Sequence, residues 1–222
     1  MNAPPAPLGA RFADFVTRRD YPCVMAASSA RLGQADVLAL GPLGPLPSPD
    51  LVAGLGASLR AFGEAPAPDK GYRSCVAVFA DPPPAGEPAF ERALWALLGA
   101  LHASDDGPWD PAVSSDPGSP EFSFSFAGRA YYVVGMHPGA SRPARRFPHA
   151  ALVFNLHAQF EALRADGRYD RVRDLIRARD VAFAGDVNPS LSDHGTESEA
   201  RQYSGRAAGP DWRCPFHPAP DG

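Results

Sequence analysis

The pattern of apolar and polar positions just past the midpoint of the chain predicts three strands followed by a helix. Phenylalanine and serine alternate at period two over residues 122–126, which predicts a strand with one aromatic face and one hydroxyl face. A short turn with Gly128 leads to a second strand at 130–136, which is almost entirely apolar and is expected to be buried on both faces. A third strand is predicted at 150–154, with a helix that begins at Asn155.

Similar patterns predict the elements on either side. Apolar residues that recur every three or four positions predict helices, and valine-rich runs bounded by Pro and Gly predict strands. Ser48 with Pro49 forms a helix-start signal, and Thr196 with Glu199 matches a capping box that opens a short helix. The predicted elements are helices at 11–19, 49–63, 88–105 and beyond Gly167, strands at 35–40 and 72–80, and a strand or tight buried segment at 23–30.

These elements predict one α+β domain. Strands clustered between 121 and 155, with helices before and after them, indicate a mixed or antiparallel sheet of about five strands flanked by helices. At 222 residues the chain is long enough for one substantial core and too short for two independent domains. We expect residues 1–10, rich in Pro and Ala, to be disordered and residues 11–222 to form the domain. An exposed strand edge after Phe126 is compatible with a homodimer.

Charge and composition narrow the class of partner. A net charge of -4 and a pI near 5.8 argue against nucleic acid or an anionic membrane as the main partner. No apolar run reaches the ~18 residues of a membrane span, and the N-terminus lacks the order of a signal peptide, so a cytoplasmic protein is expected. Cys23, Cys75 and Cys214 are widely separated, which indicates reduced thiols. Cys23 is expected in the core, because no base lies near it in sequence.

The chain lacks several motifs that identify common enzymes. It contains no Walker A loop, no G-x-G-x-x-G after a strand, no G-x-S-x-G elbow and no H-E-x-x-H pair. Their absence removes the commonest nucleotide-binding, hydrolase and zinc-peptidase interpretations.

Candidate chemistry gathers after the second central strand. Pro138 cannot continue a strand, so His137 is expected at the rim of the sheet. A cluster of arginines follows, and arginine forks suit bidentate recognition of carboxylate or phosphate. The helix after the third strand adds His157 near its start. The alternative is a solvated basic loop with two ordinary hydrogen-bonded histidines. The arginines are Arg142, Arg145 and Arg146.

A third histidine ends the helix predicted at 88–105. His102 lies seven residues after Trp95 and so shares its side of the helix. Asp105 and Asp106 follow one turn later, and a carboxylate at that distance is able to accept the second ring proton of a metal-bound imidazole. The alternative is a histidine placed favourably at the negative end of the helix dipole.

The last part of the chain is polar and acidic. Carboxylates there are the obvious partners for a cationic ligand. The segment is expected either to close a site or to be disordered, and its late aromatic residues favour order. The carboxylates are Asp186, Asp193, Glu197 and Glu199.

Together these motifs resemble the YqcI/YcgG family. The resemblance extends from Tyr21 to Phe216, and it rests on an ordered string of segments rather than on one short motif. Within the family, the chain resembles the haem-dependent guanidine and arginine N-hydroxylases of guanitoxin and cycloserine biosynthesis. The segments are LWALLGALHASD, WDP, FSFSFAGRAYYVVGMHPGASRPARRF, LVFNLHAQFEALR, VNPSL, SEARQYSGR and WRCPF.

The resemblance implies haem b and oxygen insertion into an N–H bond of a small cationic metabolite, with electrons from a reductant of unknown identity. Haem requires an axial ligand, an apolar slot and cationic partners for its propionates. His137 or His102 is expected to bind the iron, with His157 as the third choice or in a distal role. His137 and His157 are the expected catalytic residues. Arg142, Arg145 and Arg146 are expected at the propionates, Trp95 in the slot, and Glu197, Glu199 and Asp193 at the substrate.

Two other functions remain open. A haem-binding or haem-trafficking protein without turnover would use Cys214, Pro215 and His217 as a labile ligand segment. A thiolate ligand of cytochrome P450 type is not expected, because Cys214 lacks the glycine-bearing loop of those enzymes. A non-haem protein would instead bind an acidic small molecule through its arginine cluster.

Overall fold

The chain folds around a five-stranded mixed sheet with the strand order β1-β2-β5-β4-β3. The computed structural model describes residues 6–186, 188 and 195–217. β1 and β2 are parallel, and the remaining neighbours are antiparallel, so the predicted single α+β domain is confirmed. The strands are β1 (Ala35–Leu40), β2 (Ser74–Phe79), β3 (Phe124–Phe126), β4 (Arg129–Met136) and β5 (Ala151–Leu156).

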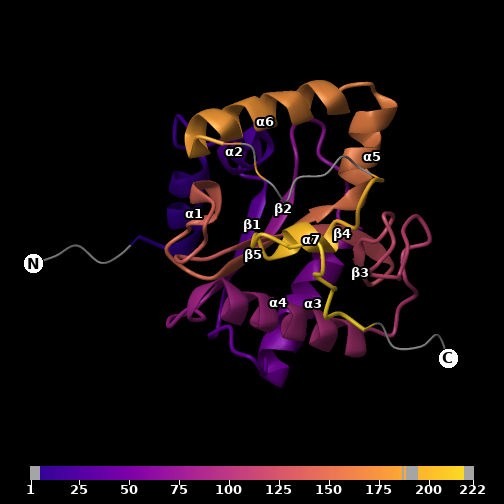
Figure 1. Cartoon of the computed structure of the whole chain (residues 1–222). Helices are drawn as coiled ribbons and strands as arrows, with labels where there is room; N and C mark the ends of the chain where they lie inside the picture. Colours follow the sequence, from indigo (N-terminus) through magenta and orange to yellow (C-terminus); the bar gives the residue numbers. More distant parts are fainter. Residues whose placement is uncertain (1–5, 187, 189–194, 218–222) are drawn as a thin grey trace, which may run out of the picture.

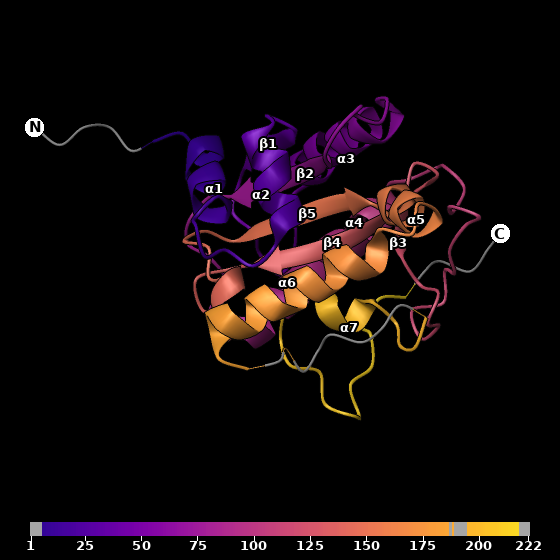
Figure 2. The ribbon, with the colours of Figure 1, turned by 90° about the horizontal axis from the view of Figure 1, so that it is seen from above.

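Helices cover both faces of the sheet (Figures 1 and 2). α3 and α4 pack on one face, whereas α1, α2, α5 and α6 lie over the other, and the short α7 sits against β4. The helices are α1 (Leu8–Val16), α2 (Val24–Arg31), α3 (Pro49–Glu64), α4 (Gly86–Ala103), α5 (His157–Ala165), α6 (Tyr169–Ala184) and α7 (Ala200–Tyr203), with a 3-10 turn η1 at Pro143–Arg145.

The two faces of the sheet belong to two hydrophobic clusters. Alternate residues of each central strand point in opposite directions, so β4 sends Tyr131 and Val133 toward α3 and α4, and Met136 toward α1. All six residues of β2 are buried. The sheet is therefore enclosed on both sides, as the apolar pattern of the central strands predicts.

The predicted hairpin is present and is made by two residues with positive φ. Ala127 has φ 52° and Gly128 has φ 69°, and Phe126 pairs with Arg129 across the turn. Positive φ at both central positions is the geometry of a type I′ turn, whose twist matches that of the two strands. The hairpin makes β3 an edge strand of the sheet.

Gly135 has a different use, which is to let two backbones approach each other. A Cβ at this position would lie 2.8 Å from the carbonyl oxygen of Tyr203 and 2.6 Å from the ring of Phe90. Any side chain here would push α7 away from β4. The glycine therefore allows α7 to lie close to β4.

The predicted helix at 49–63 is confirmed, but the strand considered for residues 23–30 is wrong. Residues 24–31 form α2, and Cys23 is its N-cap, with Sγ accepting from the backbone N–H of Ala26 at 3.4 Å. A short apolar run does not distinguish a buried strand from a helix. Here the alanines favour a helix.

Some element boundaries and one helix cap also differ from the prediction. The helix expected to begin at Asn155 begins at His157, and Asn155 stays in β5, where Oδ1 accepts from the hydroxyl of Ser74 at 2.8 Å. The helix expected from residue 11 begins at Leu8, inside the segment 1–10 that was expected to be disordered. The predicted capping box is replaced by other contacts, because α7 has no side-chain cap and Glu199 turns toward Ser123.

Candidate functional site

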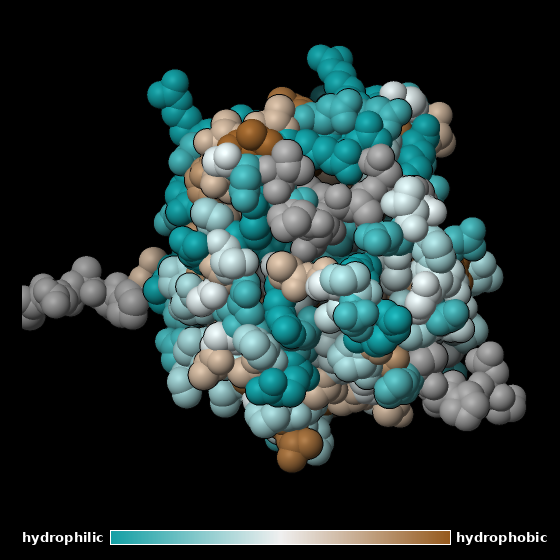
Figure 3. Space-filling view, in the orientation of Figure 1, coloured by the Kyte–Doolittle hydropathy of each residue, from teal (hydrophilic) through white to brown (hydrophobic). Residues whose placement is uncertain are grey.

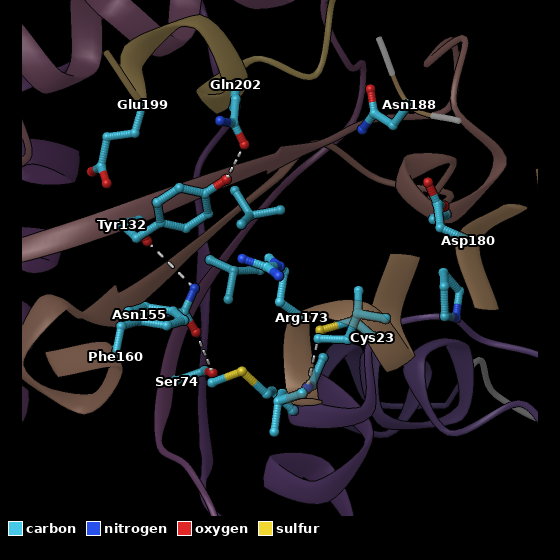
Figure 4. A pocket seen from close by; sticks show the side chains of 18 of the residues that line it. Cys23, Ser74, Tyr132, Asn155, Phe160, Arg173, Asp180, Asn188, Glu199 and Gln202 are labelled. Atoms are coloured by element: carbon cyan, nitrogen blue, oxygen red, sulfur yellow. Dashed lines mark hydrogen bonds between the residues drawn. The ribbon is translucent and has the colours of Figure 1, made fainter. Parts of the chain in front are cut away.

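A cavity of about 320 Å³ lies between the sheet and the helices α1, α2, α5 and α6. Its floor is made by β4 and β5, because period-two alternation turns Tyr132, Val134 and Met136, with Val153 beside them, toward this side. The volume is at the lower end of the range of ~300–1,000 Å³ that is usual for small-molecule sites. Figure 4 shows some of the side chains that line the cavity.

A row of hydrogen bonds crosses three strands at one end of the floor. Ser74 donates to Asn155 Oδ1 at 2.8 Å, and Asn155 Nδ2 donates to the carbonyl of Tyr132 at 3.4 Å. The hydroxyl of Tyr132 donates to Gln202 Oε1 at 2.8 Å, which connects the sheet to α7 (Figure 4). Burial raises the pKa of Tyr132, so this hydroxyl remains protonated. The row holds polar groups in fixed positions beside an apolar floor.

Glu199 is the carboxylate whose properties the cavity changes most clearly. Its Oε1 accepts from the hydroxyl of Ser123 at 2.6 Å and also from that of Tyr203. Burial raises the pKa of Glu199 to about 7, although these two hydrogen bonds lower it. Both hydrogen bonds fall on Oε1, and among the described residues none forms a hydrogen bond with Oε2, which leaves this oxygen for a ligand. Glu199 and Glu197 both line the cavity.

Two of the three predicted propionate-binding arginines line the cavity. Arg142 is buried and donates to Asp180 at 2.7 Å and to Asp186, while its Nε has no partner among the described residues. Arg145 donates to the carbonyls of Gly135 and Tyr203, both at 3.2 Å. Both arginines reach the cavity from the loop after β4.

Arg146 lies outside this group. Its Nε donates to the carbonyl of Ala140 at 2.6 Å, and its NH2 donates to that of Ser141 at 2.7 Å. The side chain closes its own loop on the exposed side, and it is not among the described residues that line the cavity. Three further arginines, from α5 and α6, do line it: Arg164, Arg173 and Arg177.

Of the three predicted iron-binding histidines, His157 is the one that lines the cavity. It is the first residue of α5, and its Nε2 lies 3.1 Å from Glu161 Oε1, one turn along the same helix. The end of β5 and the first turn of α5 thus place this imidazole at the cavity.

His137 lies apart from the cavity lining, in the interior. Its side chain is fully buried and stacks on Phe90 with ring centroids 4.4 Å apart. Neither ring nitrogen has a partner among the described residues. Burial lowers the pKa of His137, so the ring is neutral at physiological pH. His137 therefore does not share a site with His157, which lines the cavity.

His102 and Trp95 lie on the opposite face of the sheet. His102 packs edge-on against Trp109 and Phe216, at centroid distances of 5.5 Å and 5.6 Å. Trp95 is buried and stacks on Tyr203 at 5.6 Å. Asp105, the expected carboxylate partner of His102, accepts from the backbone N–H groups of Gly107 and Ala127. These residues thus form part of the core beside α4.

The structure therefore divides the predicted site residues into two sets. Arg142, Arg145, His157, Glu197 and Glu199 meet at the cavity. The others lie elsewhere, and Asp193 lies outside the described residues. Those placed elsewhere are Trp95, His102, His137 and Arg146.

Cys23 is a cavity residue that sequence reasoning placed in the core. Its side chain points into the cavity (Figure 4), and burial raises the pKa of its thiol. The available signal was the sequence Tyr21-Pro22-Cys23 before an alanine-rich run, which is compatible with a helix start. The polar residues of the floor, Tyr132 and Asn155, were also missed, because they interrupt otherwise apolar strands.

The described residues offer little else for a metal or a membrane. In the part of the chain that the structure describes, no three His, Cys, Asp or Glu side chains form a group suited to hold a metal ion. None of the helices described is both long and apolar enough to cross a bilayer. The face seen in Figure 3 is mostly hydrophilic, with apolar residues in small scattered patches.

Comparison with known proteins gives one match. The sequence model of the YqcI/YcgG family matches residues 12–217, which is nearly the whole chain and includes every described residue that lines the cavity. No match was found among curated proteins or among solved structures.

Proposed function

This chain belongs to the YqcI/YcgG family, and we propose that it is a haem-dependent oxygenase that hydroxylates a nitrogen of a small guanidine- or amine-containing metabolite. The observation that carries the proposal is the cavity, where the carboxylate of Glu199 stands beside an apolar floor and arginines. The resemblance of the sequence to haem-dependent guanidine N-hydroxylases supplies the cofactor and the reaction.

The residues of the cavity fit the requirements of haem b. Val134, Met136 and Val153 offer an apolar surface for a porphyrin. Arg142 and Arg145 supply cations for the propionates, and the unpartnered Nε of Arg142 is a buried donor that an acidic group would satisfy. Bound there, haem supplies the activation of oxygen that the amino acids of the chain do not provide.

Glu199 gives the cavity a place for the cationic end of a metabolite. A guanidinium or ammonium group bound to Oε2 would form a charge-assisted hydrogen bond, while Ser123 and Tyr203 hold the other oxygen. The cation would also favour the ionised carboxylate, whose pKa of about 7 in the empty cavity leaves it partly protonated. In the reaction, one atom of O₂ enters the N–H bond, and the other leaves as water with two electrons from the reductant and two protons.

The test combines haem titration with product analysis. Purified protein is titrated with haemin and supplied with oxygen and a reductant, or with peroxide, in the presence of arginine or simple guanidines. The expected results are a Soret band with saturable binding and a product heavier by one oxygen atom. A protein that does not bind haemin would contradict the proposal. A haem-bound protein without product would support the non-catalytic alternative.

A second candidate is favoured by the number of guanidinium groups. Five arginines line the cavity, which suits an acidic small molecule without haem. The terminal nitrogens of Arg142 already bind Asp180 and Asp186, which leaves its Nε for an acidic group, whether that group is a propionate or a small acid. Colourless protein that binds a dicarboxylate or phosphate in calorimetry would favour this candidate.

A further inference from the structure

Cys23 occupies a position in the cavity that the proposed function does not yet use. It is the N-cap of α2, and the chain enters this helix through Pro22, which also lines the cavity. In Figure 4 the Cys23 side chain lies on the opposite side of the cavity from Glu199. The thiol therefore faces the space that separates it from the proposed substrate carboxylate.

The groups around Sγ suit a thiolate that is bound to a cation. Sγ accepts from the N–H of Ala26 at 3.4 Å, and the N–H of Met25 and the charge of Arg145 also favour the ionised form. Backbone N–H groups at a helix start are established stabilisers of thiolates. Burial outweighs them and keeps the thiol protonated when no cation is present. A metal ion that binds Sγ would reverse this balance and release the proton.

A second observation, on the same helix and in the same cavity, indicates that a ligand belongs here. Ser29 of α2 lines the cavity and is buried, with 1% of its surface exposed. Its hydroxyl has no hydrogen-bond partner among the described residues. A buried hydroxyl without a partner is unfavourable, so it indicates a bound group that completes the site.

Other donors near this end of the cavity are less suited to an iron atom. The hydroxyl of Tyr21 already donates to the carbonyl of Ala144 at 3.1 Å, and ligation through this oxygen would break that hydrogen bond. Nε2 of His157 lies 3.1 Å from Oε1 of Glu161, and this contact would have to break for ligation through this nitrogen. Met25 also lines the cavity, and its thioether is the remaining soft donor.

We propose that Sγ of Cys23 is the axial ligand of the haem iron, an inference that rests on the proposed function. In forming the bond, Sγ replaces its proton with iron, the proton leaves to solvent, and neither sulfur nor iron changes oxidation state. The N–H groups at the start of α2 then face the bound sulfur and hold its negative charge. His157, on α5, remains free of the iron and acts on the substrate side.

The arrangement has a functional consequence. Figure 4 places Cys23 and Glu199 on opposite sides of the cavity, so a cofactor held by Sγ would leave the carboxylate of Glu199 for the metabolite. Thiolate ligation would increase the electron density that haem directs toward oxygen.

The experiment identifies the ligand from spectra of the full-length protein loaded with haemin. Thiolate-ligated ferrous haem with carbon monoxide absorbs at clearly longer wavelength than imidazole-ligated haem. We expect the long-wavelength band in the wild type, its loss in Cys23→Ser, and an imidazole-type band in Cys23→His. Cys214→Ser removes a thiol outside the described cavity lining, and Met25→Leu removes the thioether. Both are expected to keep the wild-type band.

The outcomes separate this inference from the function on which it rests. Wild-type protein without any Soret band would overturn both. Wild-type protein with an imidazole-type band, unchanged by Cys23→Ser and abolished by His157→Ala, would overturn the cysteine assignment and leave the oxygenase proposal standing. If Cys23→Ser fails to fold, the wild-type spectrum still decides between sulfur and nitrogen, and loss of the long-wavelength band in Cys214→Ser or Cys75→Ser would overturn the assignment to Cys23.

Discussion

Glu199 is the residue at which the charge of the cavity is set. Gln at this position keeps an oxygen that accepts from Ser123 and Tyr203, but it replaces Oε2 with an amide that repels a cation. We expect Glu199→Gln to weaken binding of a guanidine or amine ligand about 10- to 100-fold, the value of a hydrogen bond to a charged group. Titration calorimetry measures this, and unchanged affinity would remove Glu199 from the substrate site.

The same variant also tests the pKa of Glu199 through the stability of the protein. Its pKa is raised from 4.5 in the unfolded chain to about 7, so the folded state holds the proton more tightly. Stability from this group is therefore complete below 4.5 and is lost as pH rises to about 7. The difference in melting temperature between Glu199→Gln and the wild type should therefore shift in favour of the variant as the pH rises from 4.5 to about 7, and should stay constant above that pH. A pH-independent difference would contradict the assignment.

His137 gives the opposite pH dependence. Burial lowers the pKa of His137 below the ordinary 6.5. As the pH falls through 6.5, the unfolded chain therefore takes up a proton before the folded protein does, and the wild type loses stability. His137→Phe keeps a ring on Phe90 and is expected to change stability by less than ~1.5 kcal/mol at neutral pH. Thermal unfolding at neutral and acidic pH should show a smaller acid loss in the variant. Its haem spectrum should remain that of the wild type.

At the residue scale, some of the candidates named from the sequence lie together and others do not. The residues named as site candidates included Glu199, His157, Arg142 and Arg145, which meet at one cavity. His137 was expected at a sheet rim because Pro138 ends the strand, but the chain folds its ring inward onto Phe90. Which way a side chain turns after a strand ends depends on tertiary packing, and a single sequence does not contain it.

Among the elements, α6 is joined to the loop after β4 by a buried ion pair. Asp180 of α6 is buried and is paired with Arg142 at 2.7 Å. Arg142→Met removes the partner and leaves a buried charge without compensation, so we expect a loss of about 3–5 kcal/mol in the free energy of unfolding. Urea denaturation measures it.

Two further variants make this result specific to the pair. Arg146 lies in the same loop and is exposed, so Arg146→Met should change the free energy of unfolding by less than ~1 kcal/mol. Adding Asp180→Asn to Arg142→Met should restore much of the loss, because the uncompensated charge is then gone. Equal losses in Arg142→Met and Arg146→Met would show that the ion pair does not hold α6.

Elements with strong local signals were predicted well, and elements defined by context were not. Strand β1 was predicted at its observed bounds, and α3 was predicted from Ser48, whose hydroxyl accepts from the N–H of Leu51 at 3.3 Å. The hairpin turn followed from Gly128. α2 was missed because its small apolar residues fit a strand or a helix equally well. That one ambiguity also concealed the position of Cys23.

At the scale of the whole molecule, the tail connects the two faces of the sheet. Glu197 and Glu199 lie at the cavity, whereas Phe216 packs with Trp95, Trp109 and Phe122 in the core beside α4. Sequence reasoning expected an ordered tail from its aromatic residues. It did not indicate that one segment would serve both faces, because that depends on the path of the chain around the sheet edge.

Glu91 of α4 binds the segment that follows α7. It is buried and accepts from Ser204 at 3.1 Å, from Arg206 at 2.6 Å and from Nε1 of Trp212 at 3.1 Å. Glu91→Ala removes all three hydrogen bonds and is expected to lower the free energy of unfolding by about 2 kcal/mol. Trypsin should then cleave faster after Arg206.

The effect should extend to the cavity, since α7 lies between this anchor and Glu199. Hydrogen exchange of α7 should quicken in Glu91→Ala, and affinity for a cationic ligand should fall although Glu91 lies outside the described cavity lining. Arg92→Ala, the exposed neighbour on α4, is the control and should change stability by less than ~0.5 kcal/mol. Faster cleavage at Arg206 with unchanged ligand affinity would mean that the tail holds Glu199 through its contacts with Ser123 and Tyr203 alone.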